Sequence, residues 1–85
     1  MPRLIPAAER LVLARALIQK AHEVVPPVDG GKFEFSYIAQ VKDFLRQARD
    51  LVKFIPQSAG ASAEIKKDAL RVLQEADQAD REILH

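Results

Sequence analysis

The sequence contains no cysteine, and its 13 basic and 12 acidic side chains leave a formal net charge of only +1. The absence of cysteine excludes a disulfide framework and a thiolate zinc site as staples for a small fold. The near balance of charge excludes a global attraction to nucleic acid or to an anionic membrane, so such binding would need a local patch. A chain of 85 residues must therefore be stabilised by its hydrophobic core or by association with a partner.

Long hydrophobic runs are also missing from the sequence. Arg15 interrupts the longest apolar stretch far short of the roughly 20 residues that a membrane-spanning helix needs. The first residues, Met1 to Pro6, lack the charged, apolar and small-residue order of a secretory signal. We therefore expect a cytoplasmic protein with no membrane partner.

Motifs of the common enzyme classes are absent too. The sequence shows no combination of serine, histidine and acid that is typical of nucleophilic catalysis. It has no P-loop, because Gly30-Gly31-Lys32 is too short to cradle a phosphate group. We therefore expect a protein that is not an enzyme and that holds no cofactor.

What the sequence does contain is hydrophobic periodicity of the kind that predicts amphipathic helices. With 48% hydrophobic and 29% charged residues, the chain has the composition of a globular protein. The spacing predicts three helices, over residues 6–25, 36–55 and 62–84, within one helical domain that spans residues 1–85.

Residues with known positional preferences mark the ends of these helices. Pro6 suits the first helical position, because its φ is fixed and its missing N–H would have no helical partner there. Ser36 and Ser62 are the expected N-caps of the second and third helices. Pro26 and Pro56 are expected to end the first and second helices.

Each predicted helix carries an apolar stripe whose positions alternate steps of three and four residues. The stripe residues are Ala7, Leu11, Ala14, Ile18, Ala21 and Val25 in the first helix, Ile38, Val41, Leu45, Ala48, Val52 and Ile55 in the second, and Ile65, Ala69, Val72, Ala76, Ala79 and Ile83 in the third. Leu13, Leu17 and Val24 widen the first stripe, as expected of a helix that packs against two neighbours. Since short connections favour antiparallel neighbours, the sequence predicts an all-α, three-helix up-down bundle.

Two interpretations of the segment between the first two helices remain open. Val28 could pair with residues 33–35 in a short hairpin, because Phe33, Glu34 and Phe35 alternate apolar and polar character. The runs are short, however, which favours a loop that Phe33 and Phe35 clamp onto the end of the bundle.

A second apolar strip lies beside the main stripe of the third helix. Such a strip would be partly exposed in a monomer, so we expect it to be buried in a homodimer or a higher oligomer that completes the bundle. Two aspartates interrupt it, and their burial would require a nearby cation, for which the candidates in the same helix are Lys66, Arg71 and Arg81. The predicted partner-binding residues are Leu70, Leu73, Leu84, Asp77 and Asp80.

Charged residues line one face of each of the last two helices. The basic stripe of the second helix is formed by Lys42, Arg46, Arg49 and Lys53. The acidic stripe of the third helix is formed by Glu64, Asp68, Glu75 and Glu82. These stripes have three interpretations: solvated faces, ion pairs that fix the order of the helices, or a site for an outside anionic partner.

Phe54 adds an aromatic ring beside the basic stripe. A site for single-stranded nucleic acid uses cations that follow the phosphates and a ring that stacks on a base. The alternative function is therefore nucleic-acid binding through Lys42, Arg46, Arg49, Lys53 and Phe54. The more ordinary interpretation is that Phe54 packs on the following loop around Pro56.

Arg15 and His22 project from nearly the same side of the first helix, seven residues apart. This arginine, followed by six residues and a histidine, resembles the arginine-and-histidine signature of the HEPN ribonuclease superfamily. The resemblance covers one helix, and it implies that Arg15 and His22 would act on RNA across a dimer of helical bundles. The other interpretation is that Arg15 pairs with an acid such as Asp80 while His22 lies at a packed edge.

Glu82 and His85 have the spacing of carboxylate-bridged metal sites in four-helix bundles. Such sites need two motifs of this kind and further core carboxylates, so we expect no metal site. The sequence as a whole favours a small, non-enzymatic module for protein–protein interaction or assembly, which associates with itself. Nucleic-acid binding and HEPN-like RNA cleavage are the alternatives.

Overall fold

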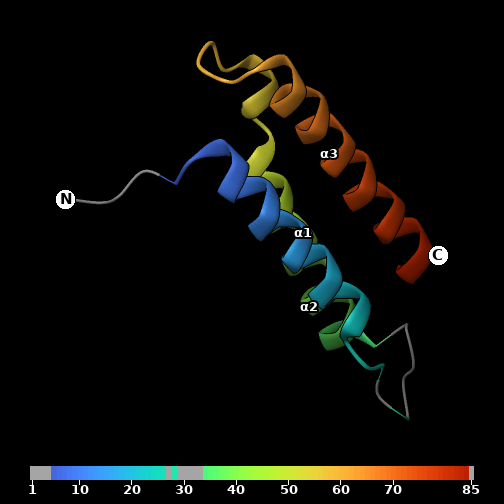
Figure 1. Cartoon of the computed structure of the whole chain (residues 1–85). Coiled ribbons are helices and arrows are strands. Elements are labelled where there is room, and N and C mark those ends of the chain that lie inside the picture. The colour runs from blue at the N-terminus through green and yellow to red at the C-terminus, as the bar shows by residue number, and fades with distance from the viewer. Residues whose placement is uncertain (1–4, 27, 29–33, 85) are drawn as a thin grey trace.

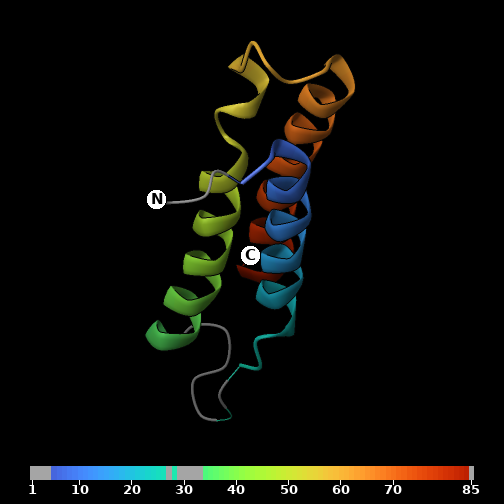
Figure 2. The ribbon, with the colours of Figure 1, turned by 60° about the vertical axis from the view of Figure 1, so that its left-hand side comes forward.

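The computed structural model describes residues 5–26, 28 and 34–84. Three α-helices follow one another, α1 (Ala7–Glu23), α2 (Phe35–Val52) and α3 (Ala63–Leu84), and a short 3₁₀ helix, η2 (Ile55–Gln57), follows α2. Neighbouring helices run in opposite directions, so that α3 returns beside the pair formed by α1 and α2 (Figures 1 and 2). The described residues contain no strand, and the predicted all-α, three-helix up-down bundle is confirmed.

Helix α1 is shorter than the predicted range of residues 6–25. Pro6 precedes it as the N-cap in an extended conformation, and its carbonyl accepts the first helical hydrogen bond, from Arg10 N at 3.0 Å. The helix ends at Glu23, because Pro26 has no N–H to continue the ladder and disfavours helical geometry at Val25. Val25, predicted to lie in the core, is therefore 82% exposed.

Helix α2 begins and ends earlier than the predicted range of residues 36–55. Its N-cap is Glu34 and not Ser36, since the Glu34 carboxylate accepts a hydrogen bond from Tyr37 N at 2.9 Å. This bond lowers the pKa of Glu34, because the backbone donors favour the ionised carboxyl. The helix ends at Val52, whose carbonyl would need an N–H from Pro56 to extend the ladder.

Helix α3 matches its predicted range to within one residue, and its predicted cap is confirmed. Ser62 Oγ accepts a hydrogen bond from Ile65 N at 3.2 Å, and Ser62 O accepts one from Lys66 N at 3.0 Å. Alanine occupies three of the four buried positions of this helix, at Ala69, Ala76 and Ala79. Small side chains at these positions allow α3 to approach the other two helices closely.

The core lies between the three helices and follows the predicted stripes. The buried hydrophobic residues are Leu11, Ala14, Ile18, Ala21, Tyr37, Val41, Leu45, Ala48, Val52, Ile55, Ala69, Val72, Ala76 and Ala79. Leu45, Val41, Val52 and Val72 are the largest of the fully buried side chains. Three of these four belong to α2, so α2 is the central element of the core.

The end of the bundle where α1 leads into α2 is not closed by Phe35. Phe35 is the first residue of α2 and is 87% exposed, so the predicted clamp onto the bundle end is wrong for this ring. Val28 is fully exposed. Phe33, the other half of the predicted clamp and of the alternative hairpin, lies outside the described residues.

The three α-helices of the described chain are all too polar or too short to cross a lipid bilayer.

Candidate functional site

The predicted partner-binding residues lie along α3 on the side that meets α2. Leu70 is half-exposed, at 50%, whereas Leu73 and Leu84 are partly buried and pack against the core. The strip is thus less open than its sequence suggests, and Leu70 is its most accessible leucine. Asp77 is exposed and Asp80 is partly buried, with side-chain exposures of 65% and 23%.

Arg49 of α2 reaches both aspartates of this strip. Its Nη2 lies 3.0 Å from an Asp77 carboxylate oxygen and 3.9 Å from an Asp80 carboxylate oxygen. Within one chain, a cation of the neighbouring helix thus contacts both acids, whereas the contribution predicted for Lys66, Arg71 or Arg81 in an antiparallel pairing of two copies stays a prediction. This arrangement brings Arg49 of the predicted basic stripe and the predicted partner-binding strip onto one surface, the α2–α3 face.

The basic stripe itself is largely paired with carboxylates. Arg46 binds Asp43 within α2, and Lys53 Nζ lies 3.1 Å from an Asp50 carboxylate oxygen. With Arg49 paired to α3, Lys42 is the one cation of the stripe that has no carboxylate partner among the described residues. These pairs reduce the positive field that would attract a phosphate backbone.

Phe54 does not lie in α2 but in the turn that follows it, and it faces α1. The ring is 69% exposed and lines a hollow with Ile5, Arg10 and Leu51. Lys53 Nζ lies 5.1 Å from the centre of the ring, which is the distance of a cation–π contact. Of the predicted nucleic-acid residues, Lys53 therefore lies beside Phe54, whereas Arg49 lies against α3.

Arg15 forms the strongest charge cluster of the described chain, between α1 and α3. Its guanidinium donates two hydrogen bonds to Asp68, at 2.9 and 2.7 Å, and two to Glu75, at 3.2 and 3.3 Å. The bonds to Asp68, followed by those to Glu75, raise the pKa of Arg15. The same bonds from Arg15 lower the pKa of Asp68, and the charge of Arg71 adds to this effect.

The ion pairs of Arg15 differ from the expected pair with Asp80. Arg15 does not pair with Asp80, which lies on the other side of α3, beside Arg49. The acidic stripe of α3 contributes Asp68 and Glu75 to Arg15 of α1, so the described acidic and basic stripes do not pair with each other.

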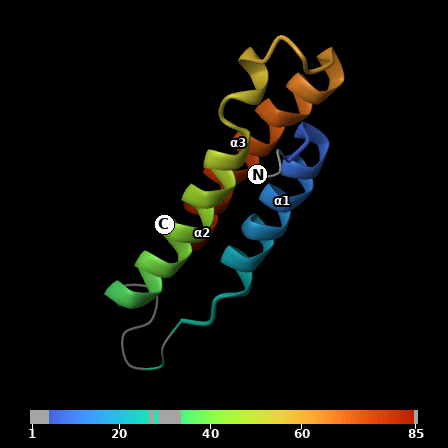
Figure 3. The same ribbon diagram turned by 90° about the vertical axis from the view of Figure 1, so that its left-hand side faces the viewer.

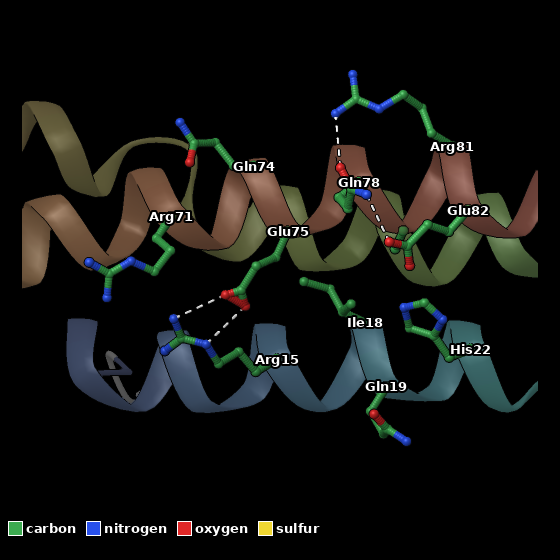
Figure 4. Close-up of a pocket in the computed structure, with 11 residues that line it drawn as sticks. Arg15, Ile18, Gln19, His22, Arg71, Gln74, Glu75, Gln78, Arg81 and Glu82 are labelled. Carbon is green, nitrogen blue, oxygen red and sulfur yellow. Dashed lines mark hydrogen bonds and ion pairs between the residues drawn. The ribbon is translucent and has the colours of Figure 1, made fainter.

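A polar groove of about 770 Å³ extends from this cluster along α1 and α3 (Figure 4). Three arginines, three glutamines, two glutamates and His22 supply its polar lining. Gln78 Nε2 donates to Glu82 at 2.7 Å, and Arg81 donates to Gln78 at 3.3 Å, so the far end of the groove is also internally hydrogen-bonded.

The two residues of the HEPN resemblance both border this groove. Figure 4 shows Arg15 beside Glu75. His22 lies about two helical turns further along α1, near Glu82. Four hydrogen bonds to two carboxylates occupy the guanidinium of Arg15. Arg15 therefore acts first as a link between α1 and α3.

The predicted Glu82 and His85 motif cannot be placed, because His85 lies outside the described residues. Within the described part of the chain, no group of three or more histidine, aspartate, glutamate or cysteine side chains could hold a metal ion.

A second surface was missed by the sequence reasoning, and it lies between α1 and α2. Its residues include Arg10, Leu51 and Phe54, which line the hollow at the start of α1. The signal that could have found it is the broadening of the first stripe by Leu13 and Leu17, because those leucines exceed what contact with one neighbour requires.

Comparisons with protein-family models, with curated proteins and with solved structures find no match for this chain. The geometry of its helix faces is therefore the basis on which a function can be proposed.

Proposed function

We propose that this protein is a small, non-enzymatic, cytoplasmic module for protein–protein interaction that associates with itself through the α2–α3 face. The observation that carries the proposal is the contact of Arg49 with Asp77 and Asp80 beside the half-exposed Leu70. Buried aspartates destabilise an interface unless a cation compensates them, and here the compensation is already built into each chain.

The spacing of the strip fits a pair of helices. Leu70, Leu73, Asp77, Asp80 and Leu84 alternate steps of three and four residues, as do the residues of a coiled-coil seam. Because Leu73 and Leu84 also contact the core, they are held in place before a partner arrives. A partly ordered apolar strip loses less side-chain entropy on association.

An antiparallel two-fold pairing of α3 with its copy suits this pattern. Leu70 and Leu84 both lie seven residues from Asp77, so an axis beside Asp77 places Leu70 of each chain against Leu84 of the other. Asp77 of the two chains then meet near the axis, where each keeps its own Arg49. Arg81 has no carboxylate partner among the described residues and lies one helical turn from Asp77, so it supplies a further cation there.

The test is a pair of matched substitutions at exposed apolar positions. Leu70→Glu places a carboxylate against Leu84 of the other chain in the proposed interface, whereas Val12→Glu places one at a 68% exposed position of α1. Sedimentation velocity should show that Leu70→Glu weakens the dimer by at least about a hundredfold, and circular dichroism should show that its helix content is kept. Val12→Glu should remain dimeric. Equal effects of the two substitutions would overturn the proposal.

A further inference from the structure

A hollow lies where the start of α1 meets the end of α2. It has a volume of about 330 Å³ and is lined by Ile5, Arg10, Leu51, Phe54 and their neighbours. Leu51 also lines a second hollow, with Leu17, Gln47 and Asp50, and the two neighbouring hollows are together called the α1–α2 groove. None of its lining residues belongs to α3, which lies behind α1 and α2 in Figure 3.

The surface along the α1–α2 groove is apolar and accessible. Phe54 is 69% exposed, and Leu13 and Ile5 are 39% and 37% exposed. Leu17 and Leu51 are partly buried against the core and form the floor. Arg10, Leu13 and Leu17 follow one another at steps of three and four residues, which places them on one side of α1.

Arg10 gives the groove its chemical character. Its Nε donates to the carbonyl oxygen of Ile5 at 3.1 Å, and its Nη1 donates to the carbonyl oxygen of Leu51 at 3.4 Å. Among the described residues it has no carboxylate partner, and its Nη2 has no hydrogen bond, in contrast to Arg15 and Arg49. The outer edge of the guanidinium can therefore donate two hydrogen bonds to one carboxylate.

We propose that the α1–α2 groove binds an amphipathic helix of another protein, whose apolar side chains are flanked by carboxylates. Apolar side chains at steps of three and four residues fill the groove over Leu13, Leu17 and Leu51, with one of them against Phe54. A carboxylate of the partner helix pairs with Arg10. This surface is separate from the α2–α3 face, so the two proposals stand independently.

A second copy of this chain is a poorer occupant of the groove. Asp50 is the sole carboxylate that lines it, and Asp50 already pairs with Lys53 at 3.1 Å. A face-to-face pairing of two such grooves would thus leave Arg10 of each chain without a free carboxylate and would oppose like charges. The charge complementarity favours a partner that brings its own acids.

The test uses two synthetic helical peptides of about 18 residues, which have blocked ends and leucines at steps of three and four residues. One carries glutamates beside the leucines, and the other carries lysines at the same positions. Fluorescence anisotropy at physiological salt should show that the glutamate peptide binds the full chain at least about tenfold more tightly than the lysine peptide. Equal affinity of the two peptides, or no binding of the glutamate peptide at 1 mM, would overturn the proposal.

Variants then assign the binding to the groove. Arg10→Gln should lower the affinity for the glutamate peptide about tenfold without changing the affinity for the lysine peptide. Phe54→Ala should also lower the affinity for the glutamate peptide. Val12→Ala, at an exposed position that lines neither hollow, should change neither affinity. If Arg10→Gln leaves the affinity for the glutamate peptide unchanged, the groove does not have the proposed occupant. The same conclusion follows if Phe54→Ala lowers the molar mass of the protein without peptide, because the groove would then bind a second copy of this chain. The Leu70→Glu variant should bind the glutamate peptide as the unchanged chain does, which separates this test from that of self-association.

Discussion

Replacement of Leu45 by alanine should destabilise the bundle more than the same replacement at the surface. Leu45 is fully buried, with an exposure of 0%, on the central helix α2. The removed carbon atoms contribute about 2.4 kcal/mol at about 0.8 kcal/mol per buried methylene, and the cavity that remains brings the expected cost to about 2–5 kcal/mol. A chain of 85 residues has a free energy of unfolding of about 4–13 kcal/mol, so this cost is a large part of the total. At about 4–8 °C per kcal/mol, the midpoint of thermal unfolding should fall by at least about 8 °C.

The matched control for this prediction is Leu13→Ala. Because Leu13 is 39% exposed, this substitution should lower the free energy of unfolding by at most about 1.5 kcal/mol. Urea unfolding followed by circular dichroism measures both variants, at several protein concentrations, so that self-association is separated from intrinsic stability. If Leu45→Ala costs no more than Leu13→Ala, or less than about 0.5 kcal/mol, then α2 is not the centre of the core.

Three further predictions follow from individual contacts. Ser62→Ala should cost about 0.5–2 kcal/mol in urea unfolding, because it removes the bond from Ile65 N, whereas Ser62→Thr should cost less. Because its folded pKa is lowered, Asp68 adds stability that is present above its ordinary pKa of 3.8 and is lost as the pH falls below that value. Asp68→Asn should therefore reduce stability by about 0.5–1 kcal/mol at pH 7 but not at pH 2, and an equal loss at both would contradict the ion pair with Arg15. Incubation with single-stranded RNA should give no cleavage, and cleavage that Arg15→Ala or His22→Ala abolishes would favour the HEPN-like alternative.

The helices and their buried faces could be predicted because local sequence determines them. Burial repeats at steps of three and four residues, and Val41, Leu45 and Val52 are buried as the periodicity indicates. The helix ends were less predictable, because several nearby residues can accept a hydrogen bond from the first N–H groups of a helix. Glu34 caps α2 in place of Ser36, since a carboxylate three residues before Tyr37 can reach its N–H equally well.

The charged contacts could not be predicted, because they depend on how the helices are rotated against one another. Sequence spacing places Asp68 and Asp80 on α3 but does not say which neighbour each one faces. The structure turns Asp68 toward Arg15 of α1 and Asp80 toward Arg49 of α2. For the same reason the α1–α2 groove emerged only from the packing, in which Arg10 is the one lining cation and has no carboxylate partner among the described residues.

The molar mass of the unchanged chain in solution tests the proposed self-association most directly. Light scattering over a range from about one to a hundred micromolar would follow association by mass action. The proposed α2–α3 interface predicts a mass near twice the 9.5 kDa of one chain at tens of micromolar, which falls toward 9.5 kDa on dilution. A constant mass of 9.5 kDa over the whole range would contradict it.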